Sequence, residues 1–125
     1  GWSAARALQA AQRCYEQHKV LTYPRTDSRC LPEDYRPEVD KVLQSFSSDR
    51  AFGPHAKYLM KNGRQNEGRV FNNAGVRDHF AIIPTGQIRN LSGDDIKLFE
   101  LVARRFLSAF FPPAVWEQVE RTTVV

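Results

Sequence analysis

The 125-residue chain has the length of one domain with a modest core. Lysine and arginine (18) exceed aspartate and glutamate (14), which gives a net charge of +4, and 42% of the residues are hydrophobic. No apolar run reaches the length that spans a bilayer and no signal-peptide pattern occurs, so we expect no membrane partner. Arginine outnumbers lysine by 13 to 5, which favours bidentate contacts with phosphate groups. A solvated basic surface is the plainer interpretation, and charge alone does not separate the two.

The two cysteines, Cys14 and Cys30, are too few and too far apart to predict a metal site, and the three histidines add no ligand spacing. We interpret both as reduced thiols of a cytoplasmic protein. The chain begins at Gly1 and stops at Val125 within a β-rich run, and we expect it to be a piece of a larger protein.

The first predicted element is a helix that Ser3 begins and that leads straight into an unusual stretch, residues 20–28. Its apolar stripe is expected at positions spaced by three and four residues: Ala4, Leu8, Ala11 and Tyr15. After it, Val20-Leu21 predicts a short buried strand, which Pro24 ends because proline lacks an N–H.

Tyr23 precedes that proline and is therefore held in extended geometry. Residues two apart in an extended chain point to the same side, so Tyr23 and Arg25 could meet at one small anion such as a phosphate. A tyrosine can act as a covalent nucleophile, and a nearby arginine would both activate it and stabilise charge on a phosphate. The plainer interpretation is a half-buried strand tyrosine beside a surface arginine.

The middle of the chain predicts helices that begin near prolines. A single turn is expected at Pro32, and a helix from Pro37 has one apolar face, made of Val39, Val42, Leu43 and Phe46. Another helix is expected from Pro54 to Gly63, with Ala56, Leu59 and Met60 on its apolar side. Residues 63–78 are rich in glycine, asparagine and arginine and predict a long mobile loop, either functional or a tolerated insertion.

The last third begins with His79 at the edge of a short buried segment, Ala81-Ile82-Ile83, which Pro84 ends. A histidine there could donate to a phosphate or transfer a proton, although a structural role is the commoner one. Ser92 and Asp95 resemble a capping box and start the strongest helix. Its apolar stripe is expected to form the spine of the core: Ile96, Phe99, Val102, Ala103, Phe106 and Phe110.

Pro112-Pro113 stops that helix, and residues 115–125 predict a strand. Arg104 and Arg105 are adjacent, so at most one of them is expected to face a catalytic cleft. The fold class that follows is mainly α with short strands (α+β), with helices around a helix-turn-helix-like core.

Four stretches resemble, in order, the type IA DNA topoisomerases. They are Gly1-Trp2-Ser3-Ala4-Ala5-Arg6, the heptapeptide Thr22-Tyr23-Pro24-Arg25-Thr26-Asp27-Ser28, the octapeptide from Asp78 to Thr85, and Leu98 to Leu107. The second is similar to the active-site tyrosine motif of that family, and the set is most similar to bacterial topoisomerase III.

The resemblance implies roles for particular residues. Tyr23 would cleave single-stranded DNA and form a 5′-phosphotyrosyl bond, Arg25 would hold the phosphate, and His79 would contact the DNA backbone. Thr26, Asp27 and Ser28 would support Tyr23 and Arg25. Many relatives carry a second histidine where this chain has Phe80, so no role of that imidazole is carried over.

The resemblance also implies a setting for the chain. Residues 1–114 would be the tyrosine (gate) domain of a toroidal multidomain enzyme of the bacterial cytoplasm, and residues 115–125 would start a β-rich connection. Mg²⁺ would be bound by a separate acidic domain, so the isolated chain is expected not to cleave DNA. No small-molecule cofactor is expected, and the partners would be single-stranded DNA and the remaining domains. The alternatives from other classes are a non-catalytic single-stranded DNA-binding module, in which Tyr23 stacks on a base, and a protein-interaction domain.

Overall fold

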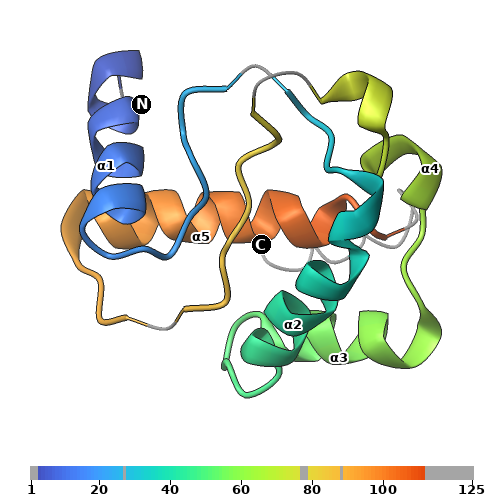
Figure 1. Ribbon diagram of the computed structural model, residues 1–125. Helices are drawn as coiled ribbons and strands as arrows, with labels where there is room; N and C mark the ends of the chain where they lie inside the picture. Colours follow the sequence, from blue (N-terminus) through green and yellow to red (C-terminus); the bar gives the residue numbers. More distant parts are fainter. Residues whose placement is uncertain (1–2, 27, 77–78, 88, 112–125) are drawn as a thin grey trace.

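The computed structural model describes residues 3–26, 28–76, 79–87 and 89–111 and is built mostly from helices (Figure 1). In chain order the elements are α1 (Ala4–Glu16), η1 (Glu33–Tyr35), α2 (Arg36–Phe46), α3 (Gly53–Asn62), α4 (Glu67–Val70), η2 (Asn73–Gly75) and α5 (Gly93–Ser108). The mainly helical prediction is therefore confirmed.

The short strands are the part of the fold class that was wrong. Across the described ranges, extended backbone pairs only as two isolated bridges, Leu21 with Pro84 (antiparallel) and Leu31 with Phe71 (parallel). Proline explains why the first does not lengthen, because Pro24 and Pro84 have no N–H to continue a ladder. The strand predicted for residues 115–125 lies outside the described residues, and the helix-turn-helix-like core stays a prediction.

Helix α5 is the spine of the core, as its pattern predicts. Leu98, Ala103, Phe106 and Leu107 are buried on it, and Phe110 is fully buried just beyond its end. In Figure 1, α5 runs behind two extended segments, and α1 packs beside its N-terminal half.

Helix α1 meets α5 with a different face from the one predicted. Its buried residues are the small ones, Ala10, Ala11 and Cys14, whereas Leu8 and Tyr15 are 36% and 37% exposed. Small side chains let two helix backbones approach closely, so this stripe faces α5. The bulkier stripe is rotated away, which places Tyr15 toward the segment that follows α1.

Ion pairs fasten the same two helices. Arg6 pairs with Asp94 at 2.6 Å, and Asp95 accepts from Arg13 at 2.7 Å and from His18 at 2.9 Å. The capping-box interpretation of Ser92 and Asp95 was therefore wrong: the Ser92 side chain caps nothing, and the Asp95 carboxylate reaches across to α1. A tertiary ion pair has replaced a local cap.

Helices α2 and α3 agree closely with their sequence patterns. The buried residues of α2 are the predicted Val39, Val42, Leu43 and Phe46, and η1 forms the expected single turn after Pro32. Helix α3 buries Ala56 and Leu59 and ends at Gly63, whose φ of +88° suits glycine. Met60 is the exception, because its side chain is 45% exposed.

Residues 63–76 are not the featureless loop that their composition predicts. They form α4 and η2, and Phe71 between them is buried and stacks on Phe110 at 6.0 Å. The Asn66 amide donates to the carbonyls of Ala109 and Phe111, and Asn72 caps η2. The asparagines thus anchor the segment by side-chain hydrogen bonds to backbone, which composition alone does not reveal.

Candidate active site around Tyr23

Two extended segments lie side by side in front of α5 and bring distant motifs together (Figure 1). We call residues 20–26 the tyrosine segment and residues 79–85 the histidine segment. They run antiparallel, with the Thr22 N–H donating to Ile83 O at 3.0 Å and the Thr85 N–H donating to Val20 O at 2.9 Å. The pairing brings the tyrosine motif and the histidine motif side by side.

The Thr22 side chain locks this pairing. Its hydroxyl donates to Ala81 O at 3.1 Å and accepts from the Ile83 N–H at 2.9 Å, and the residue is only 9% exposed. The Thr22 hydroxyl thus accepts the Ile83 N–H, which in a regular antiparallel ladder would bond the Thr22 carbonyl. Sequence reasoning assigned Thr22 no role, although a lone hydroxyl in the buried run Val20-Leu21-Thr22 was the available signal.

The Tyr23 ring lies between two other rings. His79 stacks on it, with centroids 4.3 Å apart and an interplanar angle of 30°. Tyr15 from the end of α1 stands edge-on to it at 5.3 Å and 85°. The half-buried phenol is therefore oriented by ring contacts, and Tyr15 is a positioning residue that the predicted stripe had assigned to the core.

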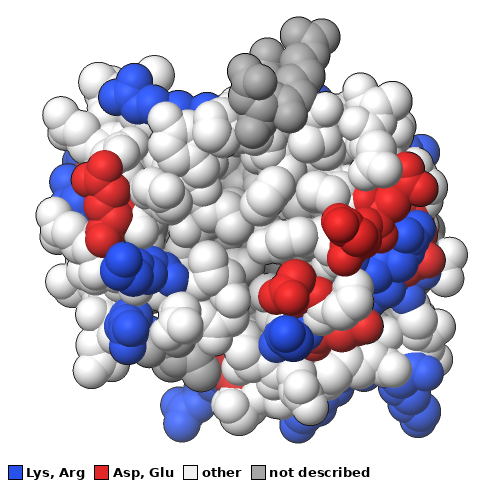
Figure 2. Space-filling view, in the orientation of Figure 1, with Lys and Arg blue, Asp and Glu red and all other residues white. Residues whose placement is uncertain are grey.

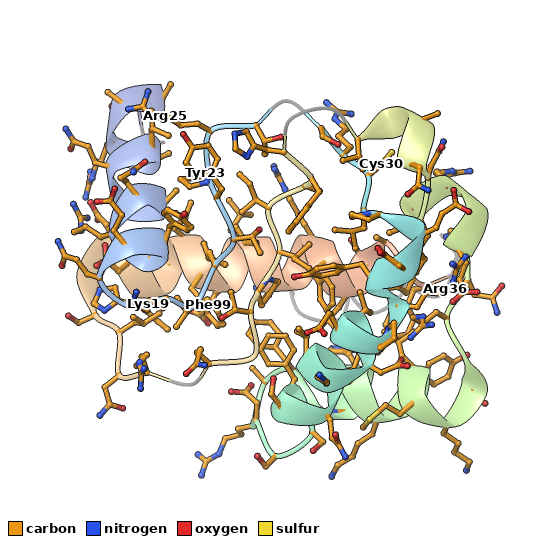
Figure 3. The ribbon with its side chains drawn as sticks, in the orientation of Figure 1. Lys19, Tyr23, Arg25, Cys30, Arg36 and Phe99 are labelled. Atoms are coloured by element: carbon orange, nitrogen blue, oxygen red, sulfur yellow. The ribbon has the colours of Figure 1, made fainter. Side chains whose placement is uncertain are left out.

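Arg25 follows Tyr23 along the same segment, and Figure 3 labels both beside α1. The Arg25 side chain is exposed and forms no ion pair with any residue in the described ranges. In Figure 2, lysine and arginine side chains lie at the upper left, the region where Figure 3 labels Arg25. A free guanidinium there is available to an anion, and its convergence with Tyr23 on one phosphate stays a prediction.

The residues after Arg25 brace the histidine segment. The Thr26 hydroxyl donates to His79 O at 3.4 Å and accepts from the Ser28 N–H at 3.1 Å. Ser28 in turn donates to Gly75 O at 2.8 Å and accepts from the Cys30 N–H at 3.2 Å. These contacts agree with a supporting role for Thr26 and Ser28, whereas Asp27 lies outside the described residues.

A groove of about 610 Å³ opens beside Tyr23. Tyr15, Lys19, Tyr23 and Phe80 are among its lining residues. Lys19 has a φ of +57°, a left-handed conformation that turns the chain from α1 into the tyrosine segment and places an ammonium group at this groove. Phe80 also contacts the ring of Tyr35 in η1, with ring centroids 4.9 Å apart.

The described residues contain no group of three or more His, Cys, Asp or Glu side chains that could hold a metal ion. Nor does any helix in these ranges have the length and apolar character needed to cross a membrane.

A family model described as DNA topoisomerase matches residues 1–125. The chain belongs to this DNA topoisomerase family. It is 38% identical over 123 residues to "DNA topoisomerase 3" of Bacillus licheniformis, and this match covers 96% of the chain and 17% of that protein. It is 42% identical over 118 residues to "DNA topoisomerase 3" of Shouchella clausii, covering 91% of the chain and 16% of that protein. The chain thus spans about one sixth of the length of the curated relatives it matches.

Proposed function

We propose that this chain is the tyrosine domain of a type IA DNA topoisomerase and that Tyr23 is its nucleophile. One observation supports the assignment most. In a chain of the topoisomerase family, the tyrosine of the Tyr-Pro-Arg motif lies between the Tyr15 and His79 rings, on a segment that Thr22 locks to the histidine motif. A nucleophile needs such an oriented side chain beside groups that bind phosphate.

The proposed step is a transesterification at one phosphodiester of single-stranded DNA. The Tyr23 phenol oxygen attacks the phosphorus, the bond from phosphorus to the 3′ oxygen breaks, and the phenol proton goes to the departing 3′ hydroxyl. The 5′ phosphate is left esterified to Tyr23. Religation is the reverse step, and because the ester keeps the energy of the broken bond, neither step needs a nucleotide cofactor.

The neighbouring residues have separate roles in this proposal. Arg25 holds the phosphate and stabilises its charge, which suits an exposed guanidinium next to the nucleophile. His79 binds the DNA backbone, and its ring also orients Tyr23 by stacking. Thr26, Asp27 and Ser28 support these groups.

The rest of the enzyme completes the site. In this proposal Mg²⁺ is bound by a separate acidic domain of the complete protein. The complete protein is a toroid in which this domain moves as a gate, so that a second strand passes and DNA is relaxed or decatenated. The isolated 125-residue chain with Mg²⁺ is expected to form no covalent adduct with DNA. An adduct from it would contradict the proposal that a separate Mg²⁺-binding domain is needed for cleavage.

The test compares the complete protein with its Tyr23→Phe variant, which keeps the ring but lacks the nucleophilic oxygen. Each is mixed with 3′-labelled single-stranded DNA and Mg²⁺, quenched in denaturant and analysed for label on protein. Label on the unmodified protein alone supports the proposal, and a 5′-labelled strand should leave no label on protein. If neither protein is labelled but both bind DNA in a salt-sensitive way, the chain is a binding module instead.

A further inference from the structure

A second cleft, of about 560 Å³, lies on the other side of the tyrosine segment from α1. Three parts of the chain line it. Residues at and after the end of the tyrosine segment contribute Thr26, Ser28 and Arg29. The histidine segment contributes Ile82 and Ile83, and α5 contributes Arg105. Its floor is apolar, because buried Phe106 and Phe110 reach it from below. The cleft is therefore an apolar hollow with hydroxyl and guanidinium groups on its walls, directly behind the groups that brace His79.

The charged side chains that line this cleft in the described ranges are all basic. Arg29 and Arg105 are exposed, neither forms an ion pair within the described ranges, and no described Asp or Glu lines the cleft. Arg104, although adjacent to Arg105, lies on a different surface with Lys97, Glu100 and Leu101. Of these two arginines, Arg105 thus lines the second cleft, and the expectation that at most one of them faces the catalytic cleft stays a prediction.

We propose that this cleft takes one nucleotide of the single-stranded DNA, with its base on the apolar floor and its phosphate between Arg29 and Arg105. Two guanidiniums match a phosphate, while an apolar hollow matches a base removed from its stack. The cleft continues from Thr26 and Ser28, so the strand that reaches Tyr23 can extend into it. This inference rests on the proposed function, because it takes the bound strand to be the one that Tyr23 cleaves.

The first test measures single-stranded DNA binding by the complete protein as a function of salt. Arg29→Ala and Arg105→Ala should each weaken binding about tenfold, the size expected for losing a charge-assisted hydrogen bond. The double variant should lower the slope of log K against log salt by about 0.7, the value for one single-strand phosphate contact. Arg104→Ala is the matched control, because it removes the same charge from the same helix and should leave the slope unchanged.

A second test examines the base. Oligonucleotides carrying one abasic site at successive positions should show a single position, near the cleavage site, where loss of the base weakens binding most. Ala109→Leu fills the cleft and keeps both arginines, so it should abolish that positional effect. An abasic profile that is flat, or that Ala109→Leu does not change, would overturn the base assignment.

The outcomes separate this inference from the proposed function. Tyr23-dependent adducts together with unchanged salt slopes in the Arg29 and Arg105 variants would refute nucleotide binding in the cleft and retain the proposed transesterification by Tyr23. If those variants instead lose thermal stability at unchanged DNA affinity, a protein segment occupies the cleft, and the proposal fails. Absence of adducts from the unmodified protein would remove the proposed function itself.

Discussion

Replacing Thr22 by valine should disconnect the tyrosine segment from the histidine segment while keeping nearly the same shape. The hydroxyl makes two hydrogen bonds, at 3.1 Å to Ala81 O and at 2.9 Å from the Ile83 N–H. Leaving the buried Ile83 N–H without a partner costs about 1–3 kcal/mol, and losing the bond to Ala81 costs about 1 kcal/mol. The added methyl group returns up to about 0.8 kcal/mol, so the net loss is about 1–3 kcal/mol.

Amide hydrogen exchange in the complete protein is the assay, because it reports local opening at Ile83. Thr22→Val should lower the protection of that amide by about 5- to 150-fold, since 1.4 kcal/mol corresponds to a factor of ten. Thr22→Ser keeps the hydroxyl and should retain most of the protection. Thr26→Val is a matched control, because the partly exposed Thr26 hydroxyl bonds His79 O at 3.4 Å and the Ser28 N–H at 3.1 Å but does not bond the Ile83 amide. Equal protection in Thr22→Val and the unmodified protein would refute the argument that this hydroxyl joins the two motifs.

Three further predictions concern α1 and its contact with α5. Tyr15→Leu removes the edge-on ring contact with Tyr23, which is worth about 1 kcal/mol, and should slow adduct formation about fivefold. Tyr15→Phe keeps the ring and should not slow adduct formation. Equal rates of adduct formation in the two variants would exclude a positioning role for Tyr15. Hydrogen bonding by Arg13 and His18 keeps the pKa of Asp95 below its ordinary value, so this contact stabilises the fold above about pH 4 and loses its effect as pH falls through the lowered pKa. Thermal melting from pH 7 to pH 3 should therefore show a steeper loss for the unmodified protein than for Asp95→Asn, and parallel curves would contradict this. Burial raises the pKa of Cys14 to about 11, so iodoacetamide at pH 8 should label Cys14 only after unfolding, and labelling of the native protein would show that α1 does not pack as described.

Much of the helical structure could be predicted from sequence because local patterns decide it. The apolar face of α2, the end of α3 at Gly63 and the core stripe of α5 follow from spacing and from the backbone preferences of proline and glycine. The motif that contains Tyr23 and Arg25, and the second motif that contains His79, could likewise be recognised from the sequence. Its resemblance to a family is confirmed at the level of DNA topoisomerase.

Errors arose where a long-range contact prevailed over a local one. The bulky stripe of α1 is a valid helical pattern, yet the small stripe packs on α5 because it allows a closer approach. Asp95 was interpreted as a local cap, but its carboxylate bonds the Arg13 guanidinium on α1 and the His18 ring just beyond α1. The asparagines of residues 63–76 are typical of loops. Composition does not reveal that the Asn66 side chain bonds the backbone of Ala109 and Phe111 just after α5.

The sequence by itself determined which residues are candidates for the chemistry, since a phenol, a guanidinium and an imidazole in those motifs are properties of the residues themselves. Only the tertiary structure decided how they are arranged. It showed that Thr22 joins two segments about sixty positions apart, that Tyr15 and His79 hold the Tyr23 ring, and that Arg105 rather than Arg104 faces the tyrosine segment. The reason is physical: these relations depend on which faces two helices and two extended segments present to each other, and packing across the whole domain sets those faces.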